Sequence, residues 1–227
     1  MNVVKTKDLK KDYLLNGLTI KALQGISLAF EEGEFAAVAG PSGSGKSTFL
    51  HLVGCLDTPT AGTIEIGGTD AAGMNRKELA MLRRSTIGFI FQAYNLIPVL
   101  SALENVSFPL VLLGESKDEA VEKSLAVLKQ VGLAGMEKRK PKEMSGGQQQ
   151  RVAIARALVK KPKLILADEP TANLDSKTGK EILELMVKLN EEEKSTFIFS
   201  THDPLVMEFA RRLITLRDGR VEEEVLR

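Results

Sequence analysis

The chain has 227 residues, of which 43% are hydrophobic and 27% are charged, and its formal net charge at pH 7 is +1. This length suits one sizeable domain or two small ones, and the balanced charge gives no electrostatic reason to expect nucleic acid as a ligand. The single cysteine, Cys55, excludes an internal disulfide and a cysteine metal cluster. The sequence has neither the apolar core of a secretion signal nor a run of about 18 apolar residues, so we expect a cytosolic chain or one bound to a membrane through a partner.

The first segment, residues 3–36, is predicted to form strands and turns, with a turn at Glu31–Glu34 before the next strand. It contains Tyr13, and the chain has no tryptophan. A tyrosine at this position fits ordinary packing in a half-buried strand. It fits equally well the stacking of its ring on a nucleobase, if a nucleotide site lies nearby, and its position favours neither interpretation.

A glycine-rich turn follows between a strand and a helix. The apolar run Phe35–Ala39 precedes it, and a helical run from Ser47 to Leu56 follows. The turn fits the G-x-x-x-x-G-K-[ST] pattern of phosphate-binding loops and consists of Gly40, Pro41, Ser42, Gly43, Ser44, Gly45, Lys46, Ser47 and Thr48. Backbone N–H groups and a helix N-terminus favour bound phosphate here, so we predict that Lys46 contacts the β- and γ-phosphates and that the Ser47 hydroxyl ligates Mg²⁺.

An uncharged stretch runs from Ser85 to Leu103. A helix over Asn75–Arg84, with Asn75 as its N-cap, is predicted before it, and the stretch opens with a buried strand at Ile87–Phe91 that ends at Gln92. The prolines in and after this stretch argue against a membrane-spanning helix. Two interpretations remain open: the stretch is plain core, or it forms an apolar surface that a membrane partner covers.

Two helices are predicted in the region that follows. A capping box formed by Ser116 and Glu119 opens the first, which presents one buried stripe up to Gly132. The second, Val152–Lys160, comes after four small or polar residues, Ser145, Gly146, Gly147 and Gln148. Small residues that open a helix make a second potential anion site, although this tetrapeptide alone is a weak signal.

Two later apolar runs end in polar side chains. The first runs from Leu164 to Asp168 and Glu169, and the second, from Phe197, ends at His202. Two adjacent acids after a buried strand are seldom structural, because isolated buried charges are costly. Ligands bind outside the carboxyl ends of parallel strands, so we predict that Asp168 holds Mg²⁺ directly or through water, that Glu169 faces the γ-phosphate and that His202 belongs to the same site.

The order of these elements indicates an α/β nucleotide-binding core with a parallel sheet. Residues 95–160 contain little that looks like a buried strand and are predicted to form a helical insertion. Residues 1–227 are predicted to form a single domain, with a terminal hairpin around Asp218–Gly219.

Taken together, the motifs resemble the ATP-binding subunit of an ATP-binding cassette (ABC) transporter over nearly the whole chain. Gly40–Thr48 matches the phosphate loop of that family, Gln92 its glutamine loop, and Leu164–Glu169 its second nucleotide motif with the catalytic acid. Ser145–Gln148 matches the signature sequence, with Met144 where leucine is common.

Three further residues match family positions. Asp175 lies in a loop, Ala172–Asp175, that resembles the dimer-interface loop, His202 matches the switch histidine, and Tyr13 aligns with the aromatic residue that stacks on adenine. The resemblance implies a phosphate-loop NTPase (RecA-like) core with an antiparallel β subdomain and a helical subdomain that carries the signature. It also implies a head-to-tail dimer, in which the phosphate loop of one copy and Ser145–Gln148 of the other enclose each ATP.

The resemblance implies ATP hydrolysis with ATP and Mg²⁺ as the bound groups. Binding would involve Lys46, Ser47, Gln92 and Asp168. Glu169 would polarise the attacking water while His202 fixes its geometry. The implied partner is an integral membrane permease, which would hold the chain at the cytoplasmic face of the inner membrane, and Gln92 would transmit the loss of the γ-phosphate to it.

The subfamily can be narrowed from local segments. Gly54–Thr60 and Phe91–Pro98 resemble cassettes that serve lipoprotein release and macrolide or peptide efflux and pair with a four-helix permease, although Ala172 stands where that subfamily often has glycine. The alternative is a non-transporting regulator of the cell-division type, which has the same motifs and differs in its partner. Soluble cassettes that act on ribosomes or DNA usually carry two cassettes or long coiled-coil insertions, and the pair Asp168–Glu169 argues against a small-molecule kinase.

Overall fold

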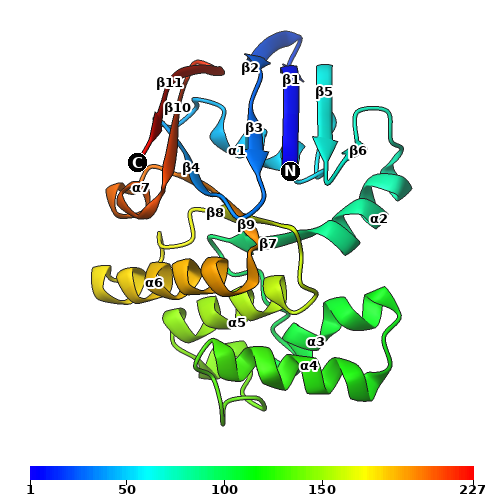
Figure 1. Cartoon of the computed structure of the whole chain (residues 1–227), viewed down its shortest axis with the longest axis vertical. Helices are drawn as coiled ribbons and strands as arrows, with labels where there is room; N and C mark the ends of the chain where they lie inside the picture. The colour runs from blue at the N-terminus through cyan, green and yellow to red at the C-terminus, as the bar shows by residue number, and fades with distance from the viewer.

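A computed structural model describes residues 1–227 and contains two sheets and a group of helices (Figure 1). The larger sheet has the order β11-β10-β4-β9-β8-β7, and only the pair β10–β11 is antiparallel. Its strands are β4 (Phe35–Ala39), β7 (Ile87–Phe91), β8 (Leu164–Asp168), β9 (Thr196–Thr201), β10 (Arg212–Arg217) and β11 (Arg220–Leu226). The continuous apolar runs of β4, β8 and β9 are buried on both faces, as expected for a covered parallel sheet.

The second sheet is antiparallel, with the order β2-β1-β5-β6 and with β3 paired to β1. Its strands are β1 (Asn2–Leu15), β2 (Leu18–Ile26), β3 (Ala29–Glu31), β5 (Ala61–Ile66) and β6 (Thr69–Asp70). The β1–β2 hairpin turns at Asn16 and Gly17, which both have positive φ, the conformation that a two-residue type I′ turn requires. This sheet occupies the upper right of Figure 1.

The helices surround the parallel sheet and extend below it in Figure 1. They are α1 (Lys46–Val53), α2 (Arg76–Thr86), α3 (Ala102–Leu113), α4 (Lys117–Gln130), the short 3₁₀ helix η1 (Pro141–Glu143), α5 (Gly146–Leu158), α6 (Ser176–Glu193) and α7 (Pro204–Phe209). The predicted caps are present, because Asn75 and Glu78 form a capping box on α2 and Ser116 and Glu119 form one on α4. No helix is both long enough and apolar enough to cross a bilayer.

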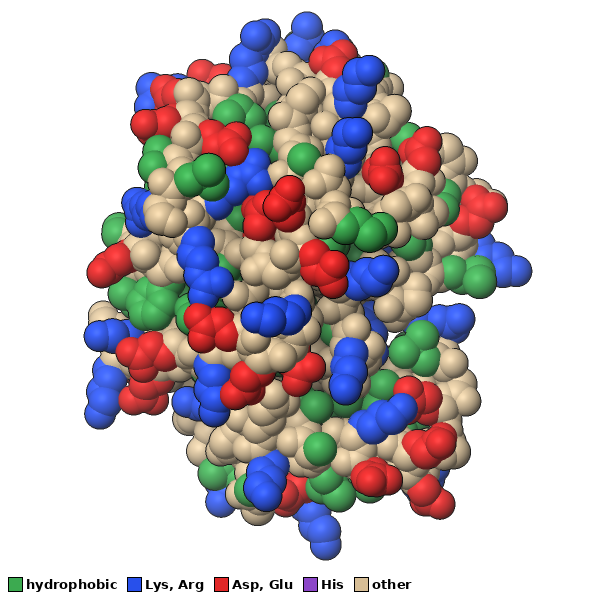
Figure 2. Space-filling model, viewed as in Figure 1, with side chains coloured by type: hydrophobic (Ala, Val, Ile, Leu, Met, Phe, Trp, Pro, Cys, Tyr) green, Lys and Arg blue, Asp and Glu red, His purple; other side chains and the backbone are tan.

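The core lies on both faces of the parallel sheet. Phe35 and Ala37 of β4 pack in a cluster with α3, α4, α5 and α6, whereas Ala36 and Val38 pack in a second cluster with α1 and the antiparallel sheet. This division follows from the alternation of side chains along a strand. Charged side chains of both signs are intermixed over the face of the molecule that Figure 2 shows.

The structure corrects two expectations. Helix α1 ends at Val53, so Cys55 lies beyond the helix, at a φ of 55°, and not on it as we expected. The predicted helical insertion also contains α3, a helix that was not predicted individually and that has Pro109 inside it. The apolar residues of α3 are divided between core and surface, because Val106 and Leu110 are buried while Val111 and Leu112 are exposed. That a membrane partner covers the exposed ones stays a prediction.

Candidate active site

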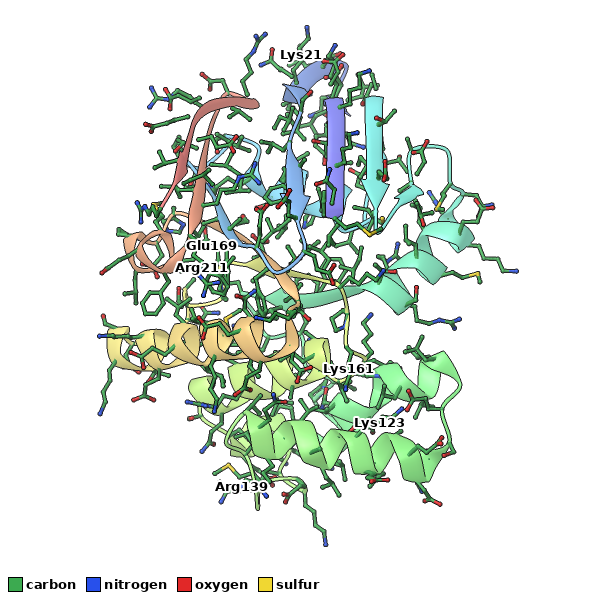
Figure 3. All side chains as sticks on the ribbon, in the orientation of Figure 1. Lys21, Lys123, Arg139, Lys161, Glu169 and Arg211 are labelled. Atoms are coloured by element: carbon green, nitrogen blue, oxygen red, sulfur yellow. The ribbon has the colours of Figure 1, made fainter.

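The predicted catalytic side chains meet at one edge of the parallel sheet. The strand pairing places Ala39 beside Thr201, Asp168 beside Ser200 and Phe91 beside Asp168, so β4, β9, β8 and β7 end together. The phosphate loop, His202, Glu169 and Gln92 therefore emerge from adjacent strands, as the sequence predicted. Figure 3 shows Glu169 near the middle of the molecule, above α6 in this view.

The phosphate loop wraps around the ammonium group of Lys46. The Lys46 Nζ donates hydrogen bonds to the carbonyls of Gly40 at 2.7 Å and Pro41 at 3.0 Å, and the side chain is buried. At Gly40 and Gly45, with φ of 146° and 103°, a Cβ would lie 2.2 Å from the Leu216 carbonyl oxygen and 2.7 Å from the Ala22 carbonyl oxygen. These two positions therefore require glycine.

The loop has the features of a phosphate site. Helix α1 begins at Lys46, within the loop sequence. Its N-cap residue is Gly45, which has no side chain, so no side chain caps the free backbone N–H groups at the start of the helix. The hydroxyl of Ser44 is buried without a hydrogen-bond partner. An anion in the loop would satisfy these groups, so the residues present fit a nucleotide phosphate.

Two oxygen ligands of the type that Mg²⁺ prefers lie next to the loop. The Ser47 hydroxyl on α1 is 3.5 Å from Asp168 Oδ1 at the end of β8, although the two residues are far apart in the sequence. The chain holds no cluster of three or more His, Cys, Asp or Glu side chains suited to a metal. The hydroxyl of Ser47 and the carboxylate of Asp168 fit a hard divalent cation, which prefers oxygen ligands. The exposed Gln92 follows β7, and its backbone carbonyl accepts a hydrogen bond from Asn173 Nδ2 at 2.8 Å.

The carboxylate of Glu169 is held by two side chains from the neighbouring strand β9. Its Oε2 accepts a hydrogen bond from the Thr201 hydroxyl at 3.1 Å, and its Oε1 lies 2.6 Å from Nδ1 of His202. The Glu169 side chain is 14% exposed and that of His202 is 70% exposed. The backbone of Glu169 has a φ of 46° and donates a hydrogen bond to the Ser200 carbonyl, so a sparsely populated conformation is fixed here. The contact of Thr201 was not predicted from the sequence.

The ring of Tyr13 lies beside α1, close to the phosphate loop. Its hydroxyl donates a hydrogen bond to Asp57 Oδ2 at 3.0 Å. Burial raises the pKa of Tyr13, and the contact with Asp57 adds to this effect. Asp57 was not predicted as a site residue, although it lies in the segment Gly54–Thr60 that carries the subfamily resemblance.

The structure does not bring the signature residues to the phosphate loop of the same chain. Ser145 is the N-cap of α5, and its capping box with Gln148 uses both polar side chains. A Cβ on Gly147 would lie 2.6 Å from Thr178 Cγ2, and no hydrogen bond joins this segment to residues 40–48. Asp175 caps α6 by accepting hydrogen bonds from the backbone and hydroxyl of Thr178.

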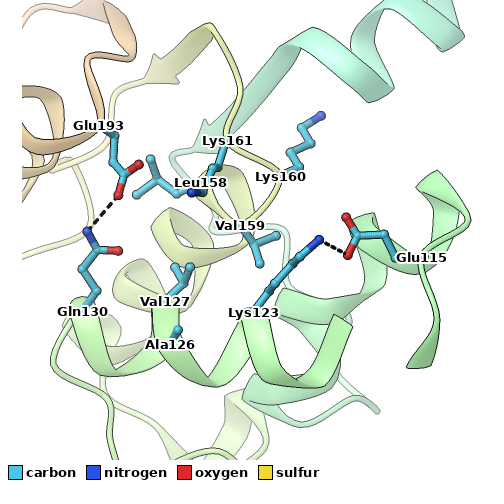
Figure 4. A pocket seen from close by; sticks show the side chains of 10 residues that line it. All are labelled: Glu115, Lys123, Ala126, Val127, Gln130, Leu158, Val159, Lys160, Lys161 and Glu193. Carbon is cyan, nitrogen blue, oxygen red and sulfur yellow. Dashed lines mark hydrogen bonds and ion pairs between the residues drawn. The ribbon is translucent and has the colours of Figure 1, made fainter. Parts of the chain in front are cut away.

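A cavity of about 570 Å³ lies elsewhere, between α4, the end of α5 and the end of α6 (Figure 4). Four charged or polar side chains in it are already paired with one another or with a neighbour. Glu115 and Lys123 are 2.7 Å apart, and Gln130 donates a hydrogen bond to Glu193. None of its lining residues belongs to the predicted nucleotide site, so this cavity has no part in the chemistry proposed below.

Comparisons with known proteins agree with this geometry. Residues 23–172 match the family described as ABC transporter. An uncharacterized ABC transporter ATP-binding protein of Methanocaldococcus jannaschii is 47% identical over 98% of this chain and 96% of its own length. Its dimeric structure in a post-hydrolysis state, bound to ADP and Pi, superposes with a TM-score of 0.90 over 98% of both chains.

Two relatives carry more specific names. The macrolide export ATP-binding/permease protein MacB of Syntrophobacter fumaroxidans is 46% identical over 99% of this chain, which spans only 32% of that protein. The lipoprotein-releasing system ATP-binding protein LolD of Syntrophus aciditrophicus is 42% identical over 96% of this chain and 98% of its own length. Because the family match covers more than half of the chain and full-length relatives exceed 40% identity, this chain belongs to the ABC transporter family as an ATP-binding protein that hydrolyses ATP to ADP and phosphate.

Proposed function

We propose that this chain powers an export-type membrane permease, with substrates of the lipoprotein or macrolide class. The observation that carries the catalytic part is the Glu169 carboxylate, which Thr201 and His202 hold at the sheet edge where the phosphate loop begins. The names of the relatives MacB and LolD support the export class. Attachment through the permease would place the chain at the cytoplasmic face of the inner membrane.

In the proposed reaction, Lys46 and the backbone of the phosphate loop bind the β- and γ-phosphates of ATP. Ser47, Asp168 and Gln92 would hold Mg²⁺, which when bound neutralises charge on the phosphate oxygens. Glu169 accepts a proton from the attacking water and orients it, and His202 keeps the carboxylate in position. Phosphoryl transfer depends mainly on positioning and charge stabilisation, so these few groups suffice.

We propose that a second copy of the chain completes each site. The helix that begins at Gly146 has free N–H groups and a glycine pair at its start, which suits a γ-phosphate. The atoms nearest to a Cβ built on Gly146 or Gly147 belong to Tyr94, Leu174, Asn173 and Thr178 and not to the phosphate loop, so the phosphate bound here would come from the partner copy. The dimeric structure of the M. jannaschii relative supports this arrangement.

The permease would dock on the apolar surface formed by α2 and α3. Met81 on α2 and Phe108, Val111 and Leu112 on α3 are exposed, and Arg84 donates a hydrogen bond to the Leu112 carbonyl and so ties the two helices together. A cavity of about 380 Å³ opens between them. Apolar patches of this kind mark interaction sites.

The glutamine loop lies between this surface and the ATP site. Arg156, on the helix that starts at the signature, donates hydrogen bonds to the backbone carbonyls of Tyr94 and Asn95 in this loop. Asn173, in the loop after Glu169, holds the Gln92 carbonyl. Movement at Gln92 on loss of the γ-phosphate would therefore reach the docking surface through rigid contacts.

Affinity capture in the native cell tests the proposal. A tagged Glu169→Gln chain is expressed there, membranes are solubilised with ATP present, and co-purifying proteins are identified. Recovery of a four-helix membrane protein with a large extracytoplasmic domain is expected, and Phe108→Asp with Val111→Asp should abolish the recovery while ATP binding stays intact. If only soluble proteins are recovered, the coupling to a permease is wrong. Recovery of a division-type membrane partner would instead establish the regulatory alternative.

A further inference from the structure

A three-residue contact fixes the ring of Tyr13 against the phosphate-loop helix. Lys11 Nζ lies 2.7 Å from Asp57 Oδ1 and also donates a hydrogen bond to the Thr58 carbonyl. The other oxygen of the same carboxylate, Asp57 Oδ2, accepts the hydrogen bond of the Tyr13 hydroxyl at 3.0 Å. Each oxygen of Asp57 thus holds one residue of β1, and Oδ1 also accepts a hydrogen bond from the backbone N–H of Thr58.

Lys11 also covers one face of the tyrosine ring. Its Nζ lies 4.9 Å from the ring centroid, within the range of a cation–π contact. The Lys11 side chain is 11% exposed, so the ammonium group is largely withdrawn from water. Tyr13 itself is 37% exposed. One face of the ring is therefore packed against a buried cation, and the ring retains an accessible surface.

The anchor of this contact is the loop that directly follows the phosphate-loop helix. Asp57 follows the end of α1, and Lys46 is the first residue of that helix. Although burial alone would raise the pKa of Asp57, the hydrogen bond from Lys11 lowers it, so the carboxylate stays charged. The ring position is thereby set relative to the phosphate loop and not only by β1.

We propose that Lys11 and Asp57 are positioning residues that hold the Tyr13 ring as a preorganised platform for the purine base of the nucleotide. The inference rests on the proposed ATP site and on the expectation from the family resemblance that Tyr13 stacks on the base. A cation beneath a ring withdraws electron density from its π-face, which favours stacking with an electron-rich purine on the opposite face. A ring held by two contacts also loses less freedom when the base binds, and this strengthens binding.

The affinities of the variants for ATP and for inorganic tripolyphosphate distinguish a platform for the base from a site for the phosphates. We expect Tyr13→Ala to weaken ATP binding in calorimetric titrations by roughly 10-fold, the scale of base–aromatic stacking. Lys11→Met and Asp57→Asn should each raise the Kd and KM for ATP about three- to tenfold with kcat unchanged, because they disturb the platform and not the reacting atoms. None of these variants should change the affinity for tripolyphosphate, which has no base.

Controls separate this role from a merely structural one. Lys10→Met removes a neighbouring lysine that pairs with the exposed Asp8, and it should leave ATP binding unchanged. Lys11→Arg, which keeps the cation, should retain most of the affinity. In the Tyr13→Ala background, Lys11→Met should have no further effect on ATP binding, because its partner ring is absent.

Three results would overturn the inference. ATP binding by Lys11→Met and Asp57→Asn could equal that of the wild type, their loss of affinity could extend equally to tripolyphosphate, or their effects could add fully to that of Tyr13→Ala. Failure of the proposed function would look different, because no membrane permease would then be recovered with the chain while the wild-type chain still bound ATP.

Discussion

Replacement of Glu169 by glutamine tests the proposed catalytic base most directly. The two carboxylate oxygens of Glu169 contact the Thr201 hydroxyl and His202 Nδ1. Glutamine has the same size, and its amide can still accept the Thr201 hydrogen bond and donate one to His202. We therefore expect the free energy of unfolding to change by less than about 1 kcal/mol, the worth of one hydrogen bond.

The substitution removes the group that accepts the proton from water. Loss of a general base lowers the rate about 10²- to 10⁴-fold, which corresponds to roughly 3–5 kcal/mol of activation free energy at about 1.4 kcal/mol for each factor of ten. Binding of ATP should persist, because Lys46 and the loop backbone are untouched, and the variant should accumulate as an ATP-bound dimer.

Single-turnover hydrolysis of labelled ATP, together with thermal unfolding and size-exclusion chromatography, measures these quantities in one set of samples. Glu208→Gln, an exposed carboxylate on α7, serves as the matched control and should hydrolyse ATP at the wild-type rate. Near-wild-type turnover by Glu169→Gln would refute the role of this residue, whereas a large loss of stability would show that the carboxylate is needed for folding.

Three further predictions concern binding and stability. Lys46→Ala should weaken ATP binding in a fluorescence titration, and an unchanged affinity would contradict the phosphate contact. Gly88→Ala places a Cβ 2.7 Å from the Ala157 carbonyl oxygen, so chemical denaturation should show a loss of about 1–3 kcal/mol, whereas Gly73→Ala, with open space around it, should be neutral. Burial raises the pKa of Cys55 to about 11, so its thiol should not react with a disulfide reagent at pH 8 until the chain unfolds. The Cys55 thiol loses its proton at lower pH in the unfolded chain than in the folded chain, so the free energy of unfolding should fall as pH rises towards 11. Denaturation of Cys55→Ala at a series of pH values should lack this decrease.

Local signals in the sequence predicted most of the site. The glycine-rich loop, the capping boxes and the polar ends of buried strands are short-range patterns, and the structure shows the loop and the strand ends at one sheet edge. The roles assigned to the site residues in ATP binding and hydrolysis stay predictions. Gln148 and Asp175, for example, have helix-capping contacts within this chain.

Two kinds of feature escaped the sequence. Helix α3 has apolar residues on both its buried and its exposed side, so it shows no helical periodicity, although Ser101 and Glu104 form a capping box that could have indicated its start. The contacts of Asp57 with Lys11 and Tyr13 join residues more than 40 positions apart, and β10 pairs with the distant β4. Such pairings depend on the assembled sheets and leave no local pattern.

The connection between β7 and β8 makes this cassette modular. The chain leaves one strand after Phe91 and returns to its immediate neighbour at Leu164, so everything between is a single excursion from two adjacent strands. That excursion contains Ser145 and α3 of the proposed docking surface, but not α2, the phosphate loop or Glu169. An exchange of residues 93–163 with those of a relative keeps Gln92, so it should change the α3 part of the docking surface and with it the choice of permease while the ATP site of the same chain remains. Such a chimera would present a foreign signature to its partner copy.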